Sequence, residues 1–569
     1  MFLTNFWFST LSTVAFAMIY NSPECLPSLI FDFIIVGEGT AGSVLANRLT
    51  EIPYYQDLVI EAGPNNEGVL NSIVPGLAVN LANSIFDWNF TTTPQAGLNG
   101  RSVEFQRGHV LGGSSSVNGM VYTRGSSSDY DRFARITGEP SWSWNALQPY
   151  VRKHEGFVPP VDGRNPAGEF DSRFHGFLGP IHTTFAALLS PSINTRILAA
   201  SRQLQADFSF NLDMNSGTPL GTGWHQSTTG NGERSGAATG YLPSNVRARP
   251  NLHILVNTRV TRILQTPGHH GFVMTSAEFT TGNNQQFPRR VLTASKEVIL
   301  SAGSIGTPHI LLHLGIGDEN ELAKVGIHPV LHLPGVGKNP TDHPLFVVGS
   351  VLNITDDADF WGDLSTNATL EAEALQLWNK NKTGPLAVFR RFDQIVWARV
   401  AQFILPNGVD PSSGPNSAHY ELALEGSATS IASGSSIVSP ASRGSVSLAT
   451  NNPFDAPLID PAYYSAASRP GHRERVYPPP LINNPSNAFL EDFLRNTSSS
   501  NAHAIGTAAM FPVDASWGVV NPDLLLKKAR GLRVVDASVY PFVPCAHTQA
   551  SVYIIAERAA DIVKAAWAA

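Results

Sequence analysis

The sequence predicts an α/β protein in which a Rossmann-like nucleotide-binding domain, discontinuous along the chain, carries an α+β second domain built from insertions. Three observations lead to this fold class. The chain has 569 residues, which exceeds the size at which a single hydrophobic core keeps growing. Near the N-terminus an apolar strand pattern leads into a glycine-rich turn and then a helical pattern. Comparable strand patterns return only after long stretches rich in turn residues, as expected of a domain interrupted by insertions.

The first twenty residues, MFLTNFWFSTLSTVAFAMIY, are apolar and contain an Ala-x-Ala pattern at Ala15 to Ala17. Because this run is short for a membrane span, we interpret residues 1–20 as the signal peptide of a secreted, extracellular protein without a membrane partner. No Lys or Arg precedes the apolar run, so an anchor or a buried strand is the alternative. Asn-x-Ser/Thr sequons agree only weakly with secretion, since a chain this long has nearly as many by chance. They begin at Asn89, Asn353, Asn367, Asn381 and Asn496.

The next segment, FDFIIVGEGTAGSVLANRL, has the order of a dinucleotide-binding fingerprint. We expect Gly37 to permit a tight turn, Gly39 to let the backbone approach a pyrophosphate, and Gly42 to let the helix pack on the strand. The helix N-terminus should attract the phosphates. A second apolar run, DLVI, leads to Glu61, nineteen residues after Gly42, whose carboxylate suits ribose hydroxyl groups. The pattern predicts a dinucleotide site without distinguishing NAD from FAD.

Later strand patterns extend the nucleotide-binding domain, and the composition limits the partners that we expect. We interpret residues 251–264, 296–316 and 531–543 as further pieces of the nucleotide-binding domain. The formal net charge of -7 matches no polyanion, so we expect no nucleic-acid partner. The two cysteines, Cys25 and Cys545, lack the spacing of a metal site, so we expect no metal.

Five motifs follow one another along nearly the whole chain after residue 30: GEGTAGSVLANRLTE, RGHVLGGSSSVNGMVYTRG, SAGSIGTPHILLHLGIG, GVGKNPTDH and GLRVVDASVYPFVPCAHTQASVYIIAERAADIV. Together they resemble the glucose–methanol–choline (GMC) oxidoreductases, which are FAD-dependent alcohol and sugar oxidases and dehydrogenases. Two further stretches, NSIFDWNFTTTPQAG and ASWGVVNPDL, are most similar to the fungal aryl-alcohol oxidase and pyranose dehydrogenase group. The resemblance implies an FAD-binding domain from residues 31–125, 225–330 and 501–569, and a substrate-binding domain from residues 126–224 and 331–500.

The loop QRGHVLGGSSSVNGM, residues 106–120, places one histidine among residues with small side chains. By the resemblance, its glycines let main-chain amides approach an isoalloxazine ring, and Asn118 hydrogen-bonds to it. Pyranose dehydrogenases have a histidine at the position of His109, bound covalently to the flavin, whereas typical aryl-alcohol oxidases have arginine there. A link of that type raises the flavin potential. The alternative is a loop histidine that makes one phosphate or backbone hydrogen bond.

The resemblance also assigns the remaining contacts to FAD. The expected cofactor-binding residues are Gly37, Gly39, Thr40, Gly42, Glu61, His109, Gly112, Gly113, Asn118, Val260, Asp536, Ala537, Thr548 and Gln549.

Oxidation of an alcohol needs a base for the hydroxyl proton while a hydride leaves the carbon, and histidine suits this near neutral pH. His503 in NAHAIGTAAM and His547 in VPCAHTQAS match the active-site pair of the family. The resemblance makes His503 the base and gives His547 the role of orienting the substrate oxygen and holding developing charge, although the two roles could be exchanged. His313, His332 and His343 are interpreted as structural.

The substrate pocket departs from the aryl-alcohol oxidases at two positions. Those enzymes have an aromatic residue before the first catalytic histidine and a tyrosine after QAG, where this chain has Ala502 and Leu98. Losing two rings should widen the entrance and favour a pyranose over a flat aromatic alcohol. The segment between PLIDPAYY and His503 is shorter than in the family by about twenty residues, and Pro478 to Pro480 forbid a helix there. That departure leaves open whether the enzyme is active.

Two classes of function remain on this evidence. The first is a secreted, monomeric sugar dehydrogenase that passes electrons to quinones or metal complexes, with an aryl-alcohol oxidase that makes hydrogen peroxide as its near alternative. The second is a fold that keeps FAD without redox turnover, either a lyase or an inactive paralogue. Retention of His109, His503 and His547 favours redox catalysis, because a lyase does not need a raised flavin potential.

Overall fold

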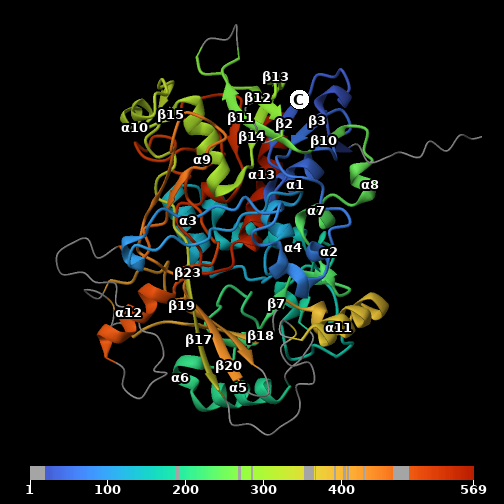
Figure 1. Cartoon of the computed structure of the whole chain (residues 1–569), viewed down its shortest axis with the longest axis vertical. Coiled ribbons are helices and arrows are strands. Elements are labelled where there is room, and N and C mark those ends of the chain that lie inside the picture. Colours follow the sequence, from blue (N-terminus) through green and yellow to red (C-terminus); the bar gives the residue numbers. More distant parts are fainter. Residues whose placement is uncertain are drawn as a thin grey trace, which may run out of the picture.

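The computed structural model describes residues 19–186, 191–266, 271–282, 286–351, 364, 367–389, 392–401, 405, 409–426, 430–465 and 486–568. Two lobes follow one another along the long axis of the molecule (Figure 1). A parallel sheet forms the centre of the first lobe and an antiparallel sheet that of the second.

The first lobe contains a six-stranded sheet in the order β1-β10-β3-β2-β14-β24, and every neighbouring pair in it is parallel. Its strands are β1 (Ile19–Tyr20), β10 (Leu252–Leu255), β3 (Asp57–Ile60), β2 (Phe33–Val36), β14 (Glu297–Leu300) and β24 (Leu532–Val534). Strands β2, β3 and β14 are buried along their whole length, as expected for a parallel sheet covered on both faces. Helix α1 (Thr40–Leu49) packs on α13 (Gln549–Ala566) next to this sheet. The predicted α/β fold class with a Rossmann-like sheet is confirmed.

The expected element at 251–264 divides into two. Leu252–Leu255 joins the parallel sheet, whereas β11 (Thr258–Leu264) forms an antiparallel sheet with β12 (Ser276–Thr281) and β13 (Arg290–Thr293). Between the two strands, Asn257 adopts a φ of 53°, and this left-handed residue redirects the chain out of the first sheet. The segment thus contributes strands to two different sheets, and its assignment to the nucleotide-binding domain stays a prediction.

The N-terminal edge of the first sheet is strand β1. Ile19 and Tyr20 pair with Ile254 and Leu255 of β10, and the Tyr20 hydroxyl lies 3.2 Å from Nδ1 of His253. Residues 1–18, which carry most of the expected signal peptide, lie outside the described residues. The expected boundary at residue 20 thus falls inside the folded sheet, while the Ala-x-Ala pattern precedes it.

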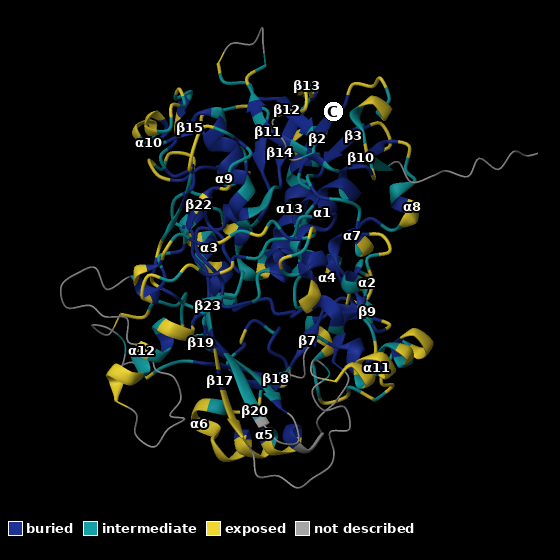
Figure 2. Cartoon of the chain, viewed as in Figure 1, coloured by how far each residue is buried: buried dark blue, intermediate teal, exposed yellow. Residues whose placement is uncertain are grey.

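The second lobe contains an antiparallel six-stranded sheet in the order β23-β17-β20-β19-β18-β6. Its strands are β23 (Ser499–Ser500), β17 (Pro344–Val351), β20 (Ser430–Ile437), β19 (Tyr420–Gly426), β18 (Phe392–Ala398) and β6 (Gly221–Trp224). The helices at its periphery, α6 (Gln205–Phe208), α11 (Ala368–Asn381) and α12 (Asn487–Thr497), are largely exposed (Figure 2). Burial is concentrated in the first lobe and between the lobes (Figure 2).

Helix α12 forms in the shortened segment that was expected to lack a helix. The hydroxyl oxygen of Ser486 accepts a hydrogen bond from the backbone N–H of Phe489 and caps the helix. Pro478 to Pro480, on which the expectation rested, lie outside the described residues. The helix therefore begins after the prolines, where nothing forbids it.

Helices α3 (Ser127–Thr137) and α4 (Trp144–His154) come from the segment assigned to the substrate-binding domain but pack on the first lobe. The Phe133 ring contacts Tyr540 and Phe542, with centroids 5.2 and 4.6 Å away. The predicted domain boundaries as a whole stay a prediction.

The remaining helices are α2 (Leu70–Ile73), α5 (Pro191–Gln203), α7 (Ala237–Gly240), α8 (Ser244–Arg247), α9 (Gly303–Leu314) and α10 (Glu319–Lys324). The remaining strands are β4 (Glu155–Phe157), β5 (Ile181–Phe185), β7 (Gln226–Ser227), β8 (Thr229–Gly230), β9 (Glu233–Arg234), β15 (Ile316–Gly317), β16 (Leu331–His332), β21 (Ser445–Ser447) and β22 (Leu458–Asp460).

Two surface features bear on the expected localisation. In the part of the chain that the structure describes, no helix is both long enough and apolar enough to cross a bilayer. Four sequon asparagines, Asn89, Asn367, Asn381 and Asn496, are exposed, and the fifth, Asn353, lies outside the described residues. Secretion stays a prediction.

Candidate functional site

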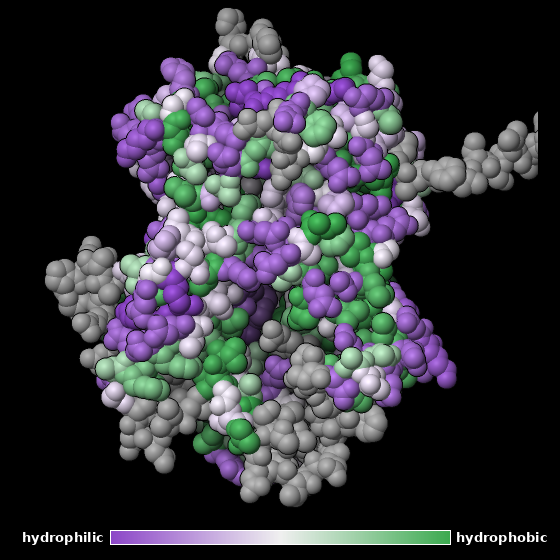
Figure 3. All heavy atoms as spheres, viewed as in Figure 1, coloured by the Kyte–Doolittle hydropathy of each residue, from purple (hydrophilic) through white to green (hydrophobic). Residues whose placement is uncertain are grey.

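A cavity of about 970 Å³ extends from the fingerprint loop of the first lobe to the sheet of the second. Figure 3 shows the molecular surface hollowed near its middle, between the lobes. One end is lined by Gly37, Gly39 and Glu61, and the other by His503 and His547. This volume is at the upper end of the range for ligand pockets and leaves room for a large cofactor together with a small substrate.

The fingerprint loop explains why its glycines are needed. Gly37 has a φ of +94°, and a Cβ added to it would lie 2.6 Å from the carbonyl oxygen of Ser301. A Cβ on Gly42 would lie only 2.0 Å from the carbonyl oxygen of Gly37, so the first turn of α1 approaches the strand end closely. Gly39 is the N-cap of α1, and the free amides of this helix end face the cavity region where Thr40 also lies.

Two buried carboxyl groups lie behind this loop. Glu61 accepts hydrogen bonds from the backbone N–H groups of Glu38 (2.8 Å) and Gly63 (2.7 Å). Burial raises the pKa of Glu61, although these bonds oppose the rise. Burial also raises the pKa of Glu38 to about 8, against the bonds it accepts from Ser43 and Gly112. Glu38 is therefore protonated at neutral pH and adds no full negative charge next to a bound phosphate. Sequence reasoning did not single out Glu38.

The loop at 106–120 packs directly on the fingerprint. Gly113 has a φ of +51°, and a Cβ there would lie 2.7 Å from the Cα of Gly39. The backbone N–H of Gly112, whose φ is +85°, donates to the carboxyl group of Glu38 at 2.5 Å. Gly113 lines the cavity, whereas Gly112 and Gly42 support it from behind. The glycines thus bring two loops, far apart in sequence, into backbone contact.

Asn118 connects this loop to the C-terminal helix. Its amide nitrogen donates to the side-chain oxygen of Gln549, and its oxygen accepts from Arg234 Nη1 at 2.8 Å. Both Asn118 and Gln549 line the cavity, as expected of residues that contact a cofactor. Thr548, the N-cap of α13, lies beside them on the wall.

The remaining predicted cofactor residues lie on the same wall. Val260 of β11, Asp536 and Ala537 line the cavity. Asp536 accepts hydrogen bonds from the backbone N–H of Gly303 (2.9 Å) and the Thr307 hydroxyl (2.5 Å), which ties α9 to the end of β24. A glycine cradle, a helix N-terminus and a buried acid around one elongated cavity fit a dinucleotide such as FAD.

His109 lies beside the cavity rather than on its wall. Its ring packs on Trp88 with centroids 4.5 Å apart, and Trp88 and Gly108 both line the cavity. Nδ1 of His109 lies 3.1 Å from the carbonyl oxygen of Ile85. When Nδ1–H donates to this oxygen, Nε2 keeps its lone pair and can act as a nucleophile.

His503 and His547 meet at the other end of the cavity. Their rings are edge to face with centroids 4.6 Å apart. The backbone N–H of His503 donates to Asp342 Oδ1 at 2.6 Å, and its Nδ1 lies 3.0 Å from Nδ1 of His343. Burial lowers the pKa of His503 well below its usual range, and two neighbouring histidines and Arg107 add to this effect. His503 is therefore neutral and able to accept a proton.

His547 has a charged partner instead. Its Nε2 lies 2.8 Å from Oε1 of Glu421, a buried residue of β19. The backbone N–H of His547 donates to the Thr123 hydroxyl at 2.8 Å, which fixes the start of this loop. A carboxylate that contacts one ring nitrogen holds the orientation of the imidazole.

Sequence reasoning missed Glu421 and Asp342 and interpreted His343 as structural. Asp342 and His343 belong to the motif GVGKNPTDH, so their position within a motif was a usable signal. Glu421 had none, because it lies 126 residues from His547 in a strand with ordinary polar alternation. Among the described residues, no group of three or more His, Cys, Asp or Glu side chains is arranged to hold a metal ion.

Of the two positions expected at the substrate pocket, Ala502 and Leu98, only the first lines the cavity. Ala502 lines the cavity next to His503, as expected. Leu98 is fully buried in a cluster with Val103, Tyr463 and Tyr464 and does not line the cavity. The expectation that Leu98 widens the entrance was therefore wrong, since its side chain packs into the protein.

Comparison with known proteins agrees with this geometry. Two GMC oxidoreductase family models match residues 31–345 and 465–556. The chain is 39% identical to a pyranose dehydrogenase of Agaricus campestris over 594 residues, which cover 96% of each chain. A solved FAD-dependent oxidoreductase from Chaetomium thermophilum is similar with a TM-score of 0.81 and 29% identity, covering 94% of this chain and 99% of that one. A solved fungal aryl-alcohol oxidase is similar with a TM-score of 0.76 and 25% identity, covering 95% of this chain and all (100%) of that one.

Proposed function

Because the chain belongs to the GMC oxidoreductase family, we propose that it is an FAD-dependent dehydrogenase that oxidises hydroxyl groups of sugars. One observation carries the proposal: a neutral histidine and a carboxylate-paired histidine face each other in a cavity that continues to a dinucleotide fingerprint. The first is His503 and the second is His547.

Bound FAD supplies the acceptor for the hydride that leaves the alcohol carbon. His503 takes the hydroxyl proton, because burial keeps its imidazole unprotonated in the resting state. His547 donates a hydrogen bond to the substrate oxygen and holds the negative charge that develops there, while its Nε2 contacts the carboxyl group of Glu421. Both side chains lie at the same end of the cavity, as these roles require.

The substrate end of the cavity supports a sugar over an aromatic alcohol. It is lined by hydrogen-bonding side chains that include Glu425, Ser436 and Asn501, and the Asn501 amide donates to the Ser436 hydroxyl at 3.0 Å. Small residues, Ala423 and Gly434, occupy the sheet face between them. A polyhydroxylated ring needs such partners, whereas a flat aromatic ring gains most from stacking surfaces. An aryl-alcohol oxidase is the second candidate, favoured by the similarity to a solved enzyme of that kind.

The proposal includes a covalent bond between His109 and the flavin. The contact between Nδ1 of His109 and the Ile85 carbonyl supports it, because this leaves Nε2 as the nucleophilic nitrogen. Two-electron acceptors such as quinones, or metal complexes, would then take the electrons onward. We also include secretion and a monomeric state in the proposal, and the exposed sequons agree with export.

The test combines turnover with flavin retention. Purified protein is assayed on glucose and on a benzylic alcohol, each with benzoquinone or oxygen as acceptor. A sugar dehydrogenase reduces benzoquinone with glucose and makes little peroxide. Faster oxidation of the benzylic alcohol with oxygen would replace the first candidate by the second.

Precipitation in acid tests the covalent bond, since a linked flavin stays yellow in the pellet. A shift in mass on glycosidase treatment of protein secreted by a fungal host tests export.

A further inference from the structure

His343 lies behind His503, on the far side from the cavity. It is fully buried, it does not line the cavity, and its Nδ1 lies 3.0 Å from Nδ1 of His503. The two rings meet at 89° with centroids 5.1 Å apart. Two ring nitrogens at this distance must share one proton, because two lone pairs or two N–H groups would repel each other.

Both rings of this pair are neutral. Burial and the neighbouring His547 together lower the pKa of His343 to about 3. His503 is neutral for the same reasons. Each ring therefore has one N–H, and only two arrangements are possible. Either His503 donates from Nδ1 and keeps a free Nε2, or His343 donates and His503 has its proton on Nε2.

The surroundings of His343 select between these arrangements. The carbonyl group of Val438 favours a proton on the His343 ring. Nδ1 of His343 faces His503, so Nε2 is the ring nitrogen left to carry that proton, although it makes no hydrogen bond within the described residues. A proton on Nε2 leaves Nδ1 of His343 as an acceptor. His503 then donates from Nδ1, and its Nε2 carries the lone pair that a base needs.

We infer that His343 is a positioning residue that fixes His503 in the tautomer with a free Nε2. This inference rests on the proposed role of His503 as the base. The preceding residue, Asp342, binds the backbone N–H of His503 at 2.6 Å, so adjacent residues hold both the backbone and the ring. Asp342 is itself held by the hydroxyl groups of Tyr463 and Ser500.

Because His343 is neutral, it can orient the ring of His503 without a negative charge that would favour its protonation. The charged and titratable groups around His503 are Arg107, Asp342, His343 and His547. A carboxylate in place of His343 would stabilise the imidazolium and protonate the base before substrate arrives. His343 orients the ring without adding negative charge. His547, by contrast, has Glu421 as its partner, and this difference separates the acceptor of the proton from the stabiliser of charge.

The test compares two variants of the holoenzyme with a control. His343→Asn places an amide oxygen near the former Nδ1 and preserves an acceptor, whereas His343→Leu fills the space without one. His253→Leu is the control, because His253 is equally buried, lies in β10 and does not line the cavity. The rate of flavin reduction by sugar is measured across pH in a stopped-flow instrument. We expect His343→Leu to be slowed about 100-fold with unchanged FAD content, and His343→Asn to stay within about tenfold of the parent.

The pH profile supplies a readout that loss of packing would not move. The imidazolium of His503 is stabilised by an acceptor for its Nδ1–H. His343→Leu removes this acceptor and should therefore lower the pKa of His503, which moves the acid limb of the rate profile to lower pH. His343→Asn keeps an acceptor, so the acid limb of its rate profile should lie at the same pH as in the parent. The inference fails if both variants slow equally, or if His343→Leu slows no more than His253→Leu.

A second measurement needs neither activity nor a His343 variant. Spectra of parent protein with ¹⁵N-labelled histidine, compared with His503→Asn to assign the signal, report which ring nitrogen of His503 is protonated. A proton on Nδ1 supports the inference, and a proton on Nε2 overturns it. Failure of the proposed function would look different, since no sugar or alcohol would then bleach the flavin of the parent.

Discussion

His503 and His547 share one cavity and lie edge to face, yet the side chains that contact their rings differ in chemistry. His503 contacts the neutral ring of His343, and His547 contacts the carboxylate of Glu421. Enzymes often obtain an acid and a base from similar side chains by placing them in unlike surroundings. We propose that these unlike surroundings give proton transfer to His503 and charge stabilisation to His547.

Replacing either His503 or His547 with Ala should leave FAD bound while flavin reduction by substrate falls at least about 100-fold. The expected cofactor contacts lie largely at the fingerprint end, whereas the role proposed for each histidine concerns charge that appears only during oxidation. Flavin absorbance after gel filtration and stopped-flow reduction measure the two effects separately. His332→Ala, at an exposed position of β16, is the control and should behave as the parent. Loss of flavin together with activity in both variants would make the two histidines structural.

His109→Ala should still bind FAD but release it on acid precipitation, where the parent keeps it. The fingerprint glycines and Glu61 do not depend on the isoalloxazine link, so occupancy should persist. Loss of the proposed covalent bond removes an electron-withdrawing substituent, so the flavin midpoint potential should fall, and substrate reduction should slow although His503 and His547 are unchanged. Spectroelectrochemistry measures the potential. If the parent itself releases all its flavin in acid, His109 is an ordinary loop histidine and the aryl-alcohol oxidase candidate gains.

At the scale of elements, the first lobe depends on two glycine loops that touch backbone to backbone. A Cβ on Gly113, in the loop at 106–120, would lie 2.7 Å from the Cα of Gly39 at the start of α1, whereas a Cβ on Gly39 would make only ordinary contacts. The contact forms the part of the cavity where the helix N-terminus is exposed to a ligand. The stability of this contact and the affinity for FAD should therefore change together.

Gly113→Ala should lower FAD occupancy more than tenfold and lower the melting temperature. Its Cβ would lie 2.7 Å from the Cα of Gly39 at a φ of +51°, so one of the two loops must move. Gly168→Ala is the matched control, because its φ is +84° and its Cβ would meet nothing within 4 Å. That variant carries only the left-handed strain of about 1 kcal/mol. Flavin content and thermal unfolding of both proteins, measured side by side, would contradict the argument if they matched.

The elements that could be predicted are those whose signals are local. The strand β2, its glycine turn, α1 and the acid at the end of β3 follow from spacing within about thirty residues, and His503 and His547 follow from motifs. The antiparallel sheet of the second lobe could not be predicted, because its register depends on pairing between distant segments such as β6 and β18. For the same reason Glu421 was missed, since only the folded sheet brings it to His547. Leu98 was misplaced because a position in a motif does not determine which way its side chain packs.

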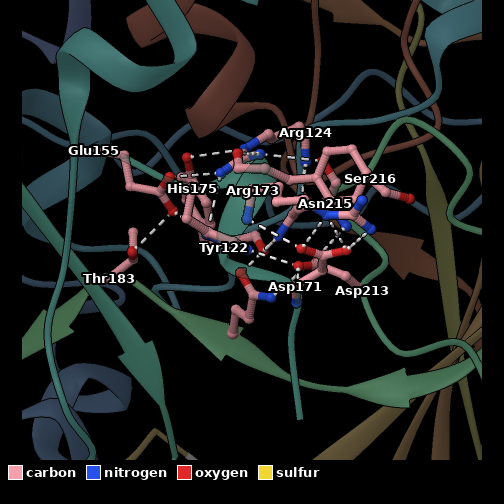
Figure 4. A network of polar contacts seen from close by, with 12 residues as sticks. Tyr122, Arg124, Glu155, Asp171, Arg173, His175, Thr183, Asp213, Asn215 and Ser216 are labelled. Carbon is pink, nitrogen blue, oxygen red and sulfur yellow. Dashed lines mark hydrogen bonds and ion pairs between the residues drawn. The ribbon is translucent and has the colours of Figure 1, made fainter. Parts of the chain in front are cut away.

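At the scale of the whole molecule, a buried polar network ties the segment after the loop at 106–120 to β4 and to the chain that leads into β6. Figure 4 shows Arg124 among the side chains of Glu155, His175 and Asp213. Arg124 Nη2 lies 2.6 Å from Glu155 Oε2, and His175 contacts Glu155 Oε1 at 2.9 Å and Asp213 Oδ2 at 2.8 Å. The four side chains are almost completely buried and alternate in charge. Removing one charge from such a network leaves the others uncompensated in a medium of low polarity.

The pKa values of the network predict how stability depends on pH. Burial opposes ionisation of Glu155, but Arg124 and His175 outweigh it and lower the pKa of this carboxyl to about 2. Its contribution is thus present above its ordinary pKa of 4.5 and is lost as the pH falls toward 2. Burial likewise opposes protonation of His175, yet Glu155 and Asp213 raise its pKa. The contribution of protonated His175 to stability is complete below its ordinary pKa of 6.5 and is lost as the pH rises through its raised pKa. The network therefore stabilises the fold most between these two ordinary values.

Glu155→Gln should accordingly destabilise the protein by about 3–5 kcal/mol near pH 5.5, because it leaves Arg124 and His175 with only one buried carboxylate. The gap in melting temperature between parent and variant should be largest from about pH 4.5 to 6.5 and should narrow on either side. Tryptophan fluorescence during heating at constant ionic strength measures it, and melting temperatures are compared because two lobes with a cofactor need not unfold in one step. Asp171→Asn is the control from the same region, since its partner Arg173 is 81% exposed and such a pair contributes little. A gap that does not vary with pH, or one no larger than in the Asp171 variant, would mean that packing rather than charge holds this junction.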